Sequence, residues 1–77
     1  MRAELFNLDL RELRKALGRS QEEIAGAMRK AQSEVSRLER RDDWYLSTLR
    51  EYVHALGGEL EIVANFGKRR VRLRGAS

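Results

Sequence analysis

The chain of 77 residues is long enough for one small domain, and a domain of this size buries only about 60% of the surface that its unfolded chain exposes. Because it has no cysteine and one histidine, a disulfide framework and a cysteine zinc site are excluded, and we expect no bound metal and no cofactor. Sixteen Lys and Arg residues against twelve Asp and Glu residues give a net charge of +4, which favours an anionic partner without deciding it.

Two helices with the same start signal are expected in the first third of the chain. Asp9 followed three residues later by Glu12 is a capping-box pattern, and Ser20 followed by Glu23 repeats it. Gly18 is expected to end the first of these helices. The apolar residues at helical spacing are Leu10, Leu13 and Leu17 in the first helix and Ile24, Ala25, Ala27 and Met28 in the second.

Two further helices are expected in the middle of the chain. The apolar rhythm resumes with Ala31, Val35 and Leu38, so the third helix follows the second after only about three residues. The fourth is expected to begin at Ser47 or Thr48 and to end at the glycine pair 57–58. Its core face consists of Leu49, Tyr52, Val53 and Leu56.

After the glycine pair the periodicity changes from helix to strand. Apolar residues alternate with polar or smaller ones in "ELEIVANF" and with arginines in "RRVRLR", and in the loop "NFGK" between them Asn65 and Gly67 tolerate positive φ. An isolated two-stranded hairpin is only marginally stable in water, so these strands must pack against another surface. A second copy of the chain is favoured over the protomer's own helices, because four short helices leave little spare apolar surface. The residues expected in this dimer contact are Leu60, Ile62, Val71 and Leu73.

These elements predict a mainly α fold. A four-helix helix-turn-helix domain is expected over residues 1–58, followed over residues 59–77 by a C-terminal β-hairpin and tail used in dimerisation. The hairpin also carries an arginine row, Arg70, Arg72 and Arg74. The row could meet DNA, an acidic partner surface or only water, and charges on an edge strand also discourage aggregation.

The third helix has a polar side of unusual composition, formed by Gln32, Ser33, Ser36 and Arg37. A glutamine amide can pair with the N7 and N6 groups of adenine, a serine hydroxyl can donate or accept, and arginine is the commonest reader of guanine. A solvated face, which is the alternative, more often carries Lys and Glu. Two helices joined by a three-residue turn also outline a helix-turn-helix, so we interpret this side as a DNA-reading surface.

Gln21 stands at the start of the second helix. Free backbone N–H groups and the positive end of the helix dipole favour a phosphate there. By composition alone, a residue that merely occupies the first helical position is an equally good interpretation, and the sequence leaves both open.

Residues 20–41, "SQEEIAGAMRKAQSEVSRLERR", resemble the Cro and phage-repressor (Xre) type of helix-turn-helix. The family commonly has a glycine at the turn, where this chain has Arg29. Either the arginine accepts a conformation easier for glycine or the second helix ends differently, and its side chain could gain a phosphate contact. The resemblance further implies that Glu39, which would repel DNA, forms a structural ion pair with Arg14. The residues it implies to touch DNA, phosphate first and bases after, are Gln21, Gln32, Ser33, Ser36 and Arg37.

Residues 47–73, "STLREYVHALGGELEIVANFGKRRVRL", are similar to the C-terminal part of HigA-type antitoxins of bacterial toxin-antitoxin modules. This resemblance implies a dimeric repressor of its own operon. It also implies a HigB/RelE-like toxin, which cleaves messenger RNA, as the partner. Periodicity and spacing show nothing of that toxin.

The leading hypothesis is a sequence-specific DNA-binding repressor that acts as a homodimer on a palindromic operator of double-stranded DNA. The alternative is a protein-interaction module that sequesters a toxin with little specific DNA binding. We expect no enzyme, because no nucleophile, acid and base can be assembled from these residues. No apolar run approaches the roughly 20 residues that cross a bilayer, so we expect no membrane association and a cytoplasmic location.

Overall fold

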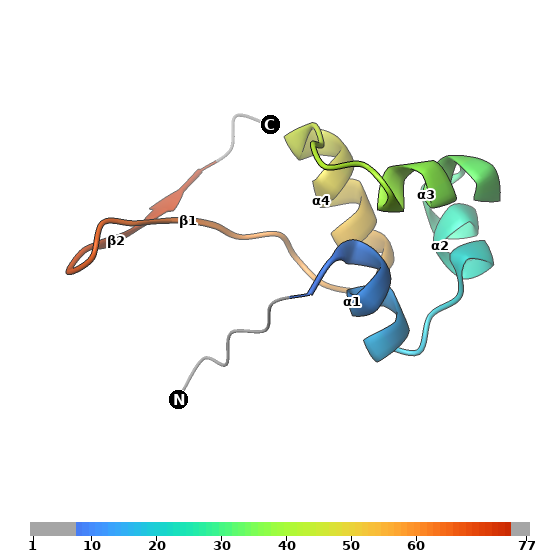
Figure 1. Cartoon of the computed structure of the whole chain (residues 1–77), viewed down its shortest axis with the longest axis horizontal. Coiled ribbons are helices and arrows are strands. Elements are labelled where there is room, and N and C mark those ends of the chain that lie inside the picture. The colour runs from blue at the N-terminus through green and yellow to red at the C-terminus, as the bar shows by residue number, and fades with distance from the viewer. Residues whose placement is uncertain (1–7, 75–77) are drawn as a thin grey trace.

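The structure, a computed structural model, describes residues 8–74 and contains four helices followed by a two-stranded sheet. Residues 1–7 and 75–77, which the expected domain limits include, lie outside this range. The expected mainly α fold with a C-terminal hairpin is confirmed (Figure 1). The elements are α1 (Leu10–Ala16), α2 (Gln21–Met28), α3 (Gln32–Glu39), α4 (Leu46–Ala55), β1 (Ile62–Asn65) and β2 (Arg70–Leu73).

Both of the first two helices begin with a complete capping box, as their sequences predict. In α1 the Asp9 carboxylate accepts from the Glu12 backbone N–H over 2.7 Å, and Glu12 accepts from the Asp9 N–H over 3.4 Å. In α2 the corresponding distances between Ser20 and Glu23 are both 3.1 Å. Backbone N–H groups that the helix itself cannot pair are satisfied in this way, so short local patterns define both starts.

The turn between α2 and α3 is built on a left-handed arginine. Arg29 has φ 57° and ψ 45°, and it is the one non-glycine residue of the described range with positive φ. The next N–H, that of Lys30, donates to the Ala25 carbonyl over 2.9 Å. The expectation that Arg29 takes a conformation easier for glycine is confirmed, and this tight turn is what sets α3 against α2.

The start of α4 differs from the prediction. The helix begins at Leu46 after Tyr45, and neither Ser47 nor Thr48 caps it, because both lie within its first turn. The cause is a tertiary contact, since the indole N–H of Trp44 donates to the Leu38 carbonyl over 2.8 Å and so ties the link to the end of α3. The glycine pair ends α4 as expected, with Gly57 at φ 91°.

The core lies where the four helices meet. Tyr52, Ile24 and Val35 have essentially no exposed surface. Three of the apolar residues at helical spacing are exposed instead: Leu17, Ala27 and Ala31. Leu17 lies beyond the last residue of α1 and Ala31 precedes the first residue of α3, so neither has its place on a helix face, whereas Ala27 lies within α2. The buried apolar residues are Leu10, Ile24, Ala25, Val35, Leu38, Tyr52 and Leu56.

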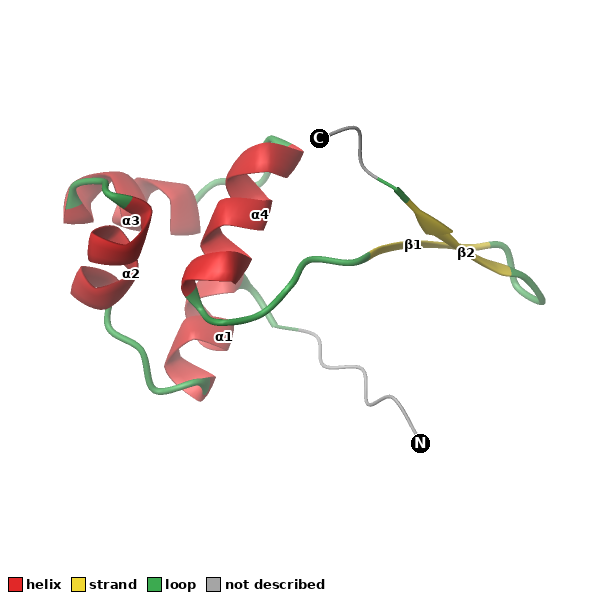
Figure 2. Cartoon of the chain, turned by 180° about the vertical axis from the view of Figure 1, so that it is seen from behind, coloured by secondary structure: helices red, strands yellow, loops and turns green. Residues whose placement is uncertain are grey.

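The hairpin projects away from the helices in both Figure 1 and Figure 2. Its strands are antiparallel, with Ile62 opposite Leu73 and Ala64 opposite Val71. Because opposite residues share a face of a sheet, these four apolar residues form one face. Within residues 8–74 this face stays partly open to solvent, with Val71 37% and Leu73 51% exposed.

The hairpin loop confirms one conformational expectation and corrects another. Gly67 has φ 87°, as expected. Asn65 does not take positive φ, because it is the last residue of β1 and its side chain instead accepts from the Gly67 N–H over 3.0 Å. The asparagine therefore shapes the turn through its side chain, as in an Asx-turn.

Candidate nucleic-acid interface

The outer side of α3 presents the polar residues that the sequence singles out. Gln32, Ser33 and Arg37 are exposed and Ser36 is partly exposed. On the opposite side of the same helix Val35 and Leu38 are buried in the core. The helix therefore has one side that holds it in place and one that is free to meet a ligand.

An open hollow lies where the first turn of α1, the start of α2 and the outer side of α3 come together. Three of the predicted contact residues line it: Gln21, Gln32 and Ser36. Arg37 lines a separate hollow with Lys30, and Arg29 lines a third one beside α4. The structure thus brings together part of the predicted set, and it places Arg29 and Arg37 on other parts of the surface.

A buried ion pair supports the hollow from below. Arg14 Nε lies 2.7 Å from Glu39 Oε2, and Arg14 Nη2 donates to Glu39 Oε1 over 3.3 Å. Their side chains are only 8% and 2% exposed. The Tyr52 hydroxyl donates toward the same Oε2 over 2.6 Å and lies 3.1 Å from the Leu10 carbonyl. The two residues that the family resemblance pairs are therefore in contact, within a network that also includes α4.

The network shifts the pKa of each group in it. Burial raises the pKa of Glu39, but the hydrogen bonds from Arg14, Tyr52 and Gln21 outweigh burial, so the pKa of Glu39 lies below its usual value. The hydrogen bond to Glu39 raises the pKa of Arg14. Burial and the adjacent carboxylate raise the pKa of Tyr52 well above that of a free phenol. At neutral pH the site therefore holds a carboxylate, a guanidinium and a neutral phenol.

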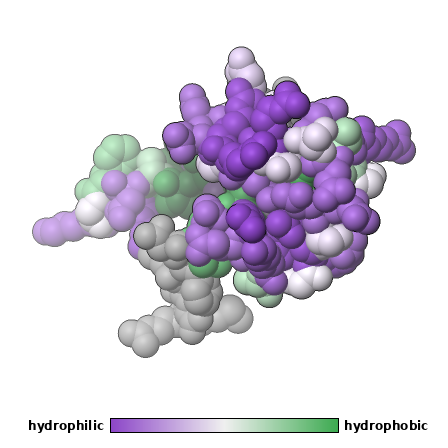
Figure 3. All heavy atoms as spheres, turned by 45° about the vertical axis from the view of Figure 1, so that its right-hand side comes forward, coloured by the Kyte–Doolittle hydropathy of each residue, from purple (hydrophilic) through white to green (hydrophobic). Residues whose placement is uncertain are grey.

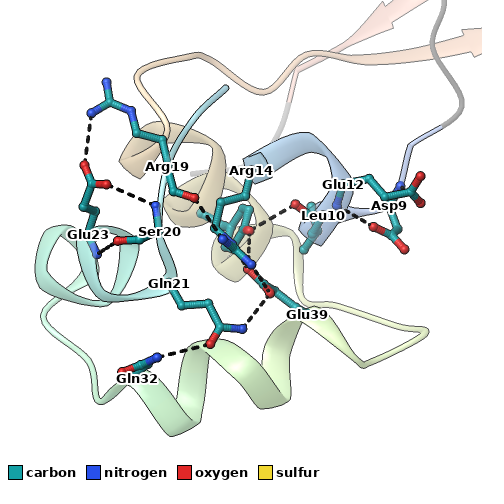
Figure 4. A network of polar contacts seen from close by, with 11 residues as sticks. Asp9, Leu10, Glu12, Arg14, Arg19, Ser20, Gln21, Glu23, Gln32 and Glu39 are labelled. Carbon is teal, nitrogen blue, oxygen red and sulfur yellow. Dashed lines mark hydrogen bonds and ion pairs between the residues drawn. The ribbon is translucent and has the colours of Figure 1, made fainter. Parts of the chain in front are cut away.

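Gln21 connects this buried network to the exposed side of α3 (Figure 4). Its Nε2 donates to Glu39 Oε1 over 2.9 Å, and its Oε1 accepts from Gln32 Nε2 over 3.4 Å. The side chain of Gln21 thus has two protein partners, one on each side of its amide. From the residues alone, the sequence left open whether Gln21 contacts a phosphate or merely occupies the first helical position. It gave no sign of these contacts, because the partners of Gln21 are 18 and 11 residues away in the chain.

Three arginines that were not among the predicted contacts also line the hollow: Arg11, Arg40 and Arg41. All three are exposed. A signal for two of them was present in the sequence, since "ERR" stands at the end of the helix whose polar side is predicted to read bases. Positive charge beside a base-reading helix favours contacts with the phosphate backbone.

Within residues 8–74 no group of His, Cys, Asp and Glu side chains is arranged to hold a metal ion. None of the helices in that range is both long and apolar enough to cross a membrane.

The chain is similar to known proteins over most of its length. The helix-turn-helix family model HTH_3 matches residues 10–63. Two Mycobacterium tuberculosis proteins that carry provisional names as the antitoxins HigA3 and HigA2 are 49% and 44% identical to it, over 83% and 87% of the chain. The chain spans 62% of the length of the first relative and 68% of the second.

Solved structures extend this similarity to the fold. A structure described as a DNA-bound antitoxin HigA3 matches 95% of the chain, and the match covers 97% of that structure with a TM-score of 0.83 and 43% identity. A second, a HigA antitoxin described as bending DNA through a unique dimerisation, matches 95% of the chain and is covered completely, with a TM-score of 0.85 and 43% identity.

Proposed function

The chain belongs to the helix-turn-helix family HTH_3, and on that premise we propose that it is a sequence-specific DNA-binding repressor that acts as a homodimer. The observation that carries the proposal is the division of α3 into a buried side and a side of free, base-competent polar groups. Gln32, Ser33, Ser36 and Arg37 read bases in the major groove, and the arginines of the hollow contact phosphates. Arg29 at the turn is a further phosphate contact.

The homodimer forms through the hairpin. The open apolar face of β1 and β2 is a poor surface to leave in water, and Figure 3 shows hydrophobic residues gathered on the hairpin, apart from the largely hydrophilic helical body. Pairing with a second copy covers this face, with Leu60, Ile62, Val71 and Leu73 in the contact. The dimer then presents two recognition helices to successive major grooves about 34 Å apart, on a palindromic operator.

The repressor is the antitoxin of a bacterial toxin-antitoxin module. Two similar proteins are named as HigA antitoxins, and the two solved structures described above are HigA antitoxins, one of them bound to DNA. The chain accordingly represses its own operon from the bacterial cytoplasm and neutralises a HigB/RelE-like toxin encoded beside it.

Fluorescence anisotropy with the DNA upstream of the chain's own reading frame tests this function. We expect binding that exceeds binding to a shuffled sequence by at least about 10³-fold and that weakens steeply as salt rises. The matched variant is Ser33→Ala, whose exposed hydroxyl makes none of the hydrogen bonds described above, so a selective loss reports DNA contact rather than folding. Equal affinity for both DNAs at low salt would contradict the proposal, and adding the neighbouring gene product then tests the interaction-module alternative.

A further inference from the structure

The hydrogen-bond chain from the core to the surface of α3 has one direction. Tyr52 donates to Glu39 Oε2 over 2.6 Å, and Gln21 Nε2 donates to Glu39 Oε1 over 2.9 Å. Gln32 Nε2 in turn donates to Gln21 Oε1 over 3.4 Å. Every donor therefore points back toward the buried carboxylate, and the chain ends at an exposed side chain on the proposed DNA-reading side (Figure 4).

The carboxylate fixes this direction. An ionised carboxylate only accepts hydrogen bonds, so Gln21 must turn its N–H toward Glu39 and its oxygen toward Gln32. If the Gln21 amide were reversed, its oxygen would face the oxygen of a negative group. Because Gln21 offers an acceptor, Gln32 has to place Nε2 on the Gln21 side and Oε1 on the far side.

A fixed amide discriminates between the two purines. In the major groove adenine offers the N7 acceptor and the N6 donor, whereas guanine offers two acceptors, N7 and O6. An amide whose donor and acceptor ends are fixed can pair with both adenine groups, but its oxygen meets O6 of guanine. A free amide can rotate and donate to O6 instead. Holding Gln32 in one orientation therefore raises the discrimination against guanine.

We propose that Glu39 is a positioning residue for base recognition: through Gln21 it fixes the amide of Gln32, and so makes α3 prefer adenine to guanine at one base pair. Tyr52 and Arg14 hold the carboxylate from the other side, so that each Glu39 oxygen accepts two donors. Tyr52 is fully buried, which leaves Glu39 little freedom to turn. The inference rests on the proposed DNA-binding function and adds to it what selects the base.

The test compares two operators that differ only by adenine or guanine at the base pair that Gln32 reads. That pair is identified as the one whose preference Gln32→Ala abolishes. We expect the unchanged protein to bind the adenine operator at least about fivefold more tightly than the guanine operator. This ratio of affinities corresponds to the free energy of one good base contact. Gln21→Met keeps the length of the side chain but removes its amide, and the ratio is expected to fall below about twofold.

Gln21 is only partly buried at the first position of α2, so the methionine variant is expected to fold. If it weakens binding to both operators by one common factor, Gln21 acts on a phosphate and the inference is wrong. If Gln32→Ala abolishes no preference, the inference fails while the proposed function stands. If the unchanged protein selects no operator at all, the proposed function fails and this inference fails with it.

Variants at the buried end extend the test. Glu39→Gln introduces an N–H that can donate to Gln21 and so reverse the direction of the hydrogen bonds. The ratio of affinities for the adenine and guanine operators should therefore approach one, in protein that circular dichroism shows to be folded. Tyr52→Phe removes one of the two donors on Oε2, and a smaller decrease is expected. An unchanged ratio in folded Glu39→Gln protein overturns the inference, and if that variant does not fold, the Gln21→Met result decides alone.

Discussion

The helical body and the hairpin differ in which groups they bury and which they leave exposed. In the body even the charged pair Arg14 and Glu39 is buried, and among the described residues that are not exposed, no buried side-chain nitrogen or oxygen lacks a hydrogen-bond partner. The hairpin leaves an apolar face partly open, and its ion pair, Arg72 with Glu61 at 3.6 Å, is largely exposed. The body therefore buries its core within one chain, whereas the proposed dimer would cover the open face of the hairpin with a second one.

The largest expected effect is the loss of the buried carboxylate. Glu39→Ala leaves Arg14 buried without its partner, and we expect the free energy of unfolding to fall by about 3 to 5 kcal/mol, measured by urea denaturation. The matched change in the hairpin, Glu61→Ala, breaks an exposed pair and should cost less than about 1 kcal/mol. If Glu39→Ala left stability unchanged and altered only DNA affinity, the ion pair would not be structural.

The next effect concerns the hairpin face. Ile62→Asp places a charge in the proposed dimer contact, so light scattering should report a monomer, and operator affinity should fall by about 10²-fold because the two half-site readers are no longer linked. Val63→Asp is the control, since Val63 is the next residue along β1 and lies on the opposite face. Equal effects of the two substitutions would show that the hairpin face does not form the dimer.

A smaller effect is expected from one base contact in the body. Arg37→Ala should weaken operator binding by about 1 to 3 kcal/mol if Arg37 reads a guanine, with the loss confined to operators that carry that guanine. Competition binding over operators changed one base pair at a time measures this. A uniform loss over all sequences would make Arg37 a phosphate contact.

Acid should destabilise the helical body more than the hairpin. The pKa of Glu39 in the folded chain lies below its usual value, so the ionised carboxylate stabilises the folded state. This stabilisation is fully present above the pKa of the unfolded chain, near 4.5, and is lost as pH falls through the lower folded pKa. The free energy of unfolding, measured by urea titration at several pH values, should therefore decline below about pH 4.5. Glu39→Gln should reduce this decline, and an identical pH profile for the two proteins would contradict the role of Glu39.

The smallest effect is expected at the rim of the hollow. Arg40→Ala should weaken binding about equally for every DNA sequence and reduce the slope of log affinity against log salt by about one. Binding isotherms at four or five salt concentrations measure this slope. An unchanged slope would mean that Arg40 contacts no phosphate.

A structural feature could be predicted from the sequence when the interactions that determine it join residues close together in the chain. The starts of α1 and α2 could be predicted because each capping box spans four residues. The left-handed Arg29 could be anticipated because the family that the chain resembles commonly has a glycine at that position. The start of α4 could not, because it depends on the contact of Trp44 with the Leu38 carbonyl. Leu17 and Ala31 keep helical spacing but lie just outside helix ends.

The same distinction holds for the candidate site. The polar side of α3 follows from spacing alone, since its period of 3.6 residues separates Gln32 and Arg37 from Val35. The contacts of Gln21 with Glu39 and Gln32 join residues far apart in the chain, and no local pattern indicates them. Sequence therefore predicts which residues are free to bind, while the structure shows which of them are held by others.

Selection of binding sites from a pool of randomised DNA by the 77-residue chain tests the central claim most directly. Two recognition helices on one dimer should enrich a palindrome whose half-sites are about 10 base pairs apart, centre to centre, and Ile62→Asp should abolish that enrichment. Enrichment of no sequence, or of a single half-site that Ile62→Asp protein selects equally well, would contradict a dimeric, sequence-specific repressor.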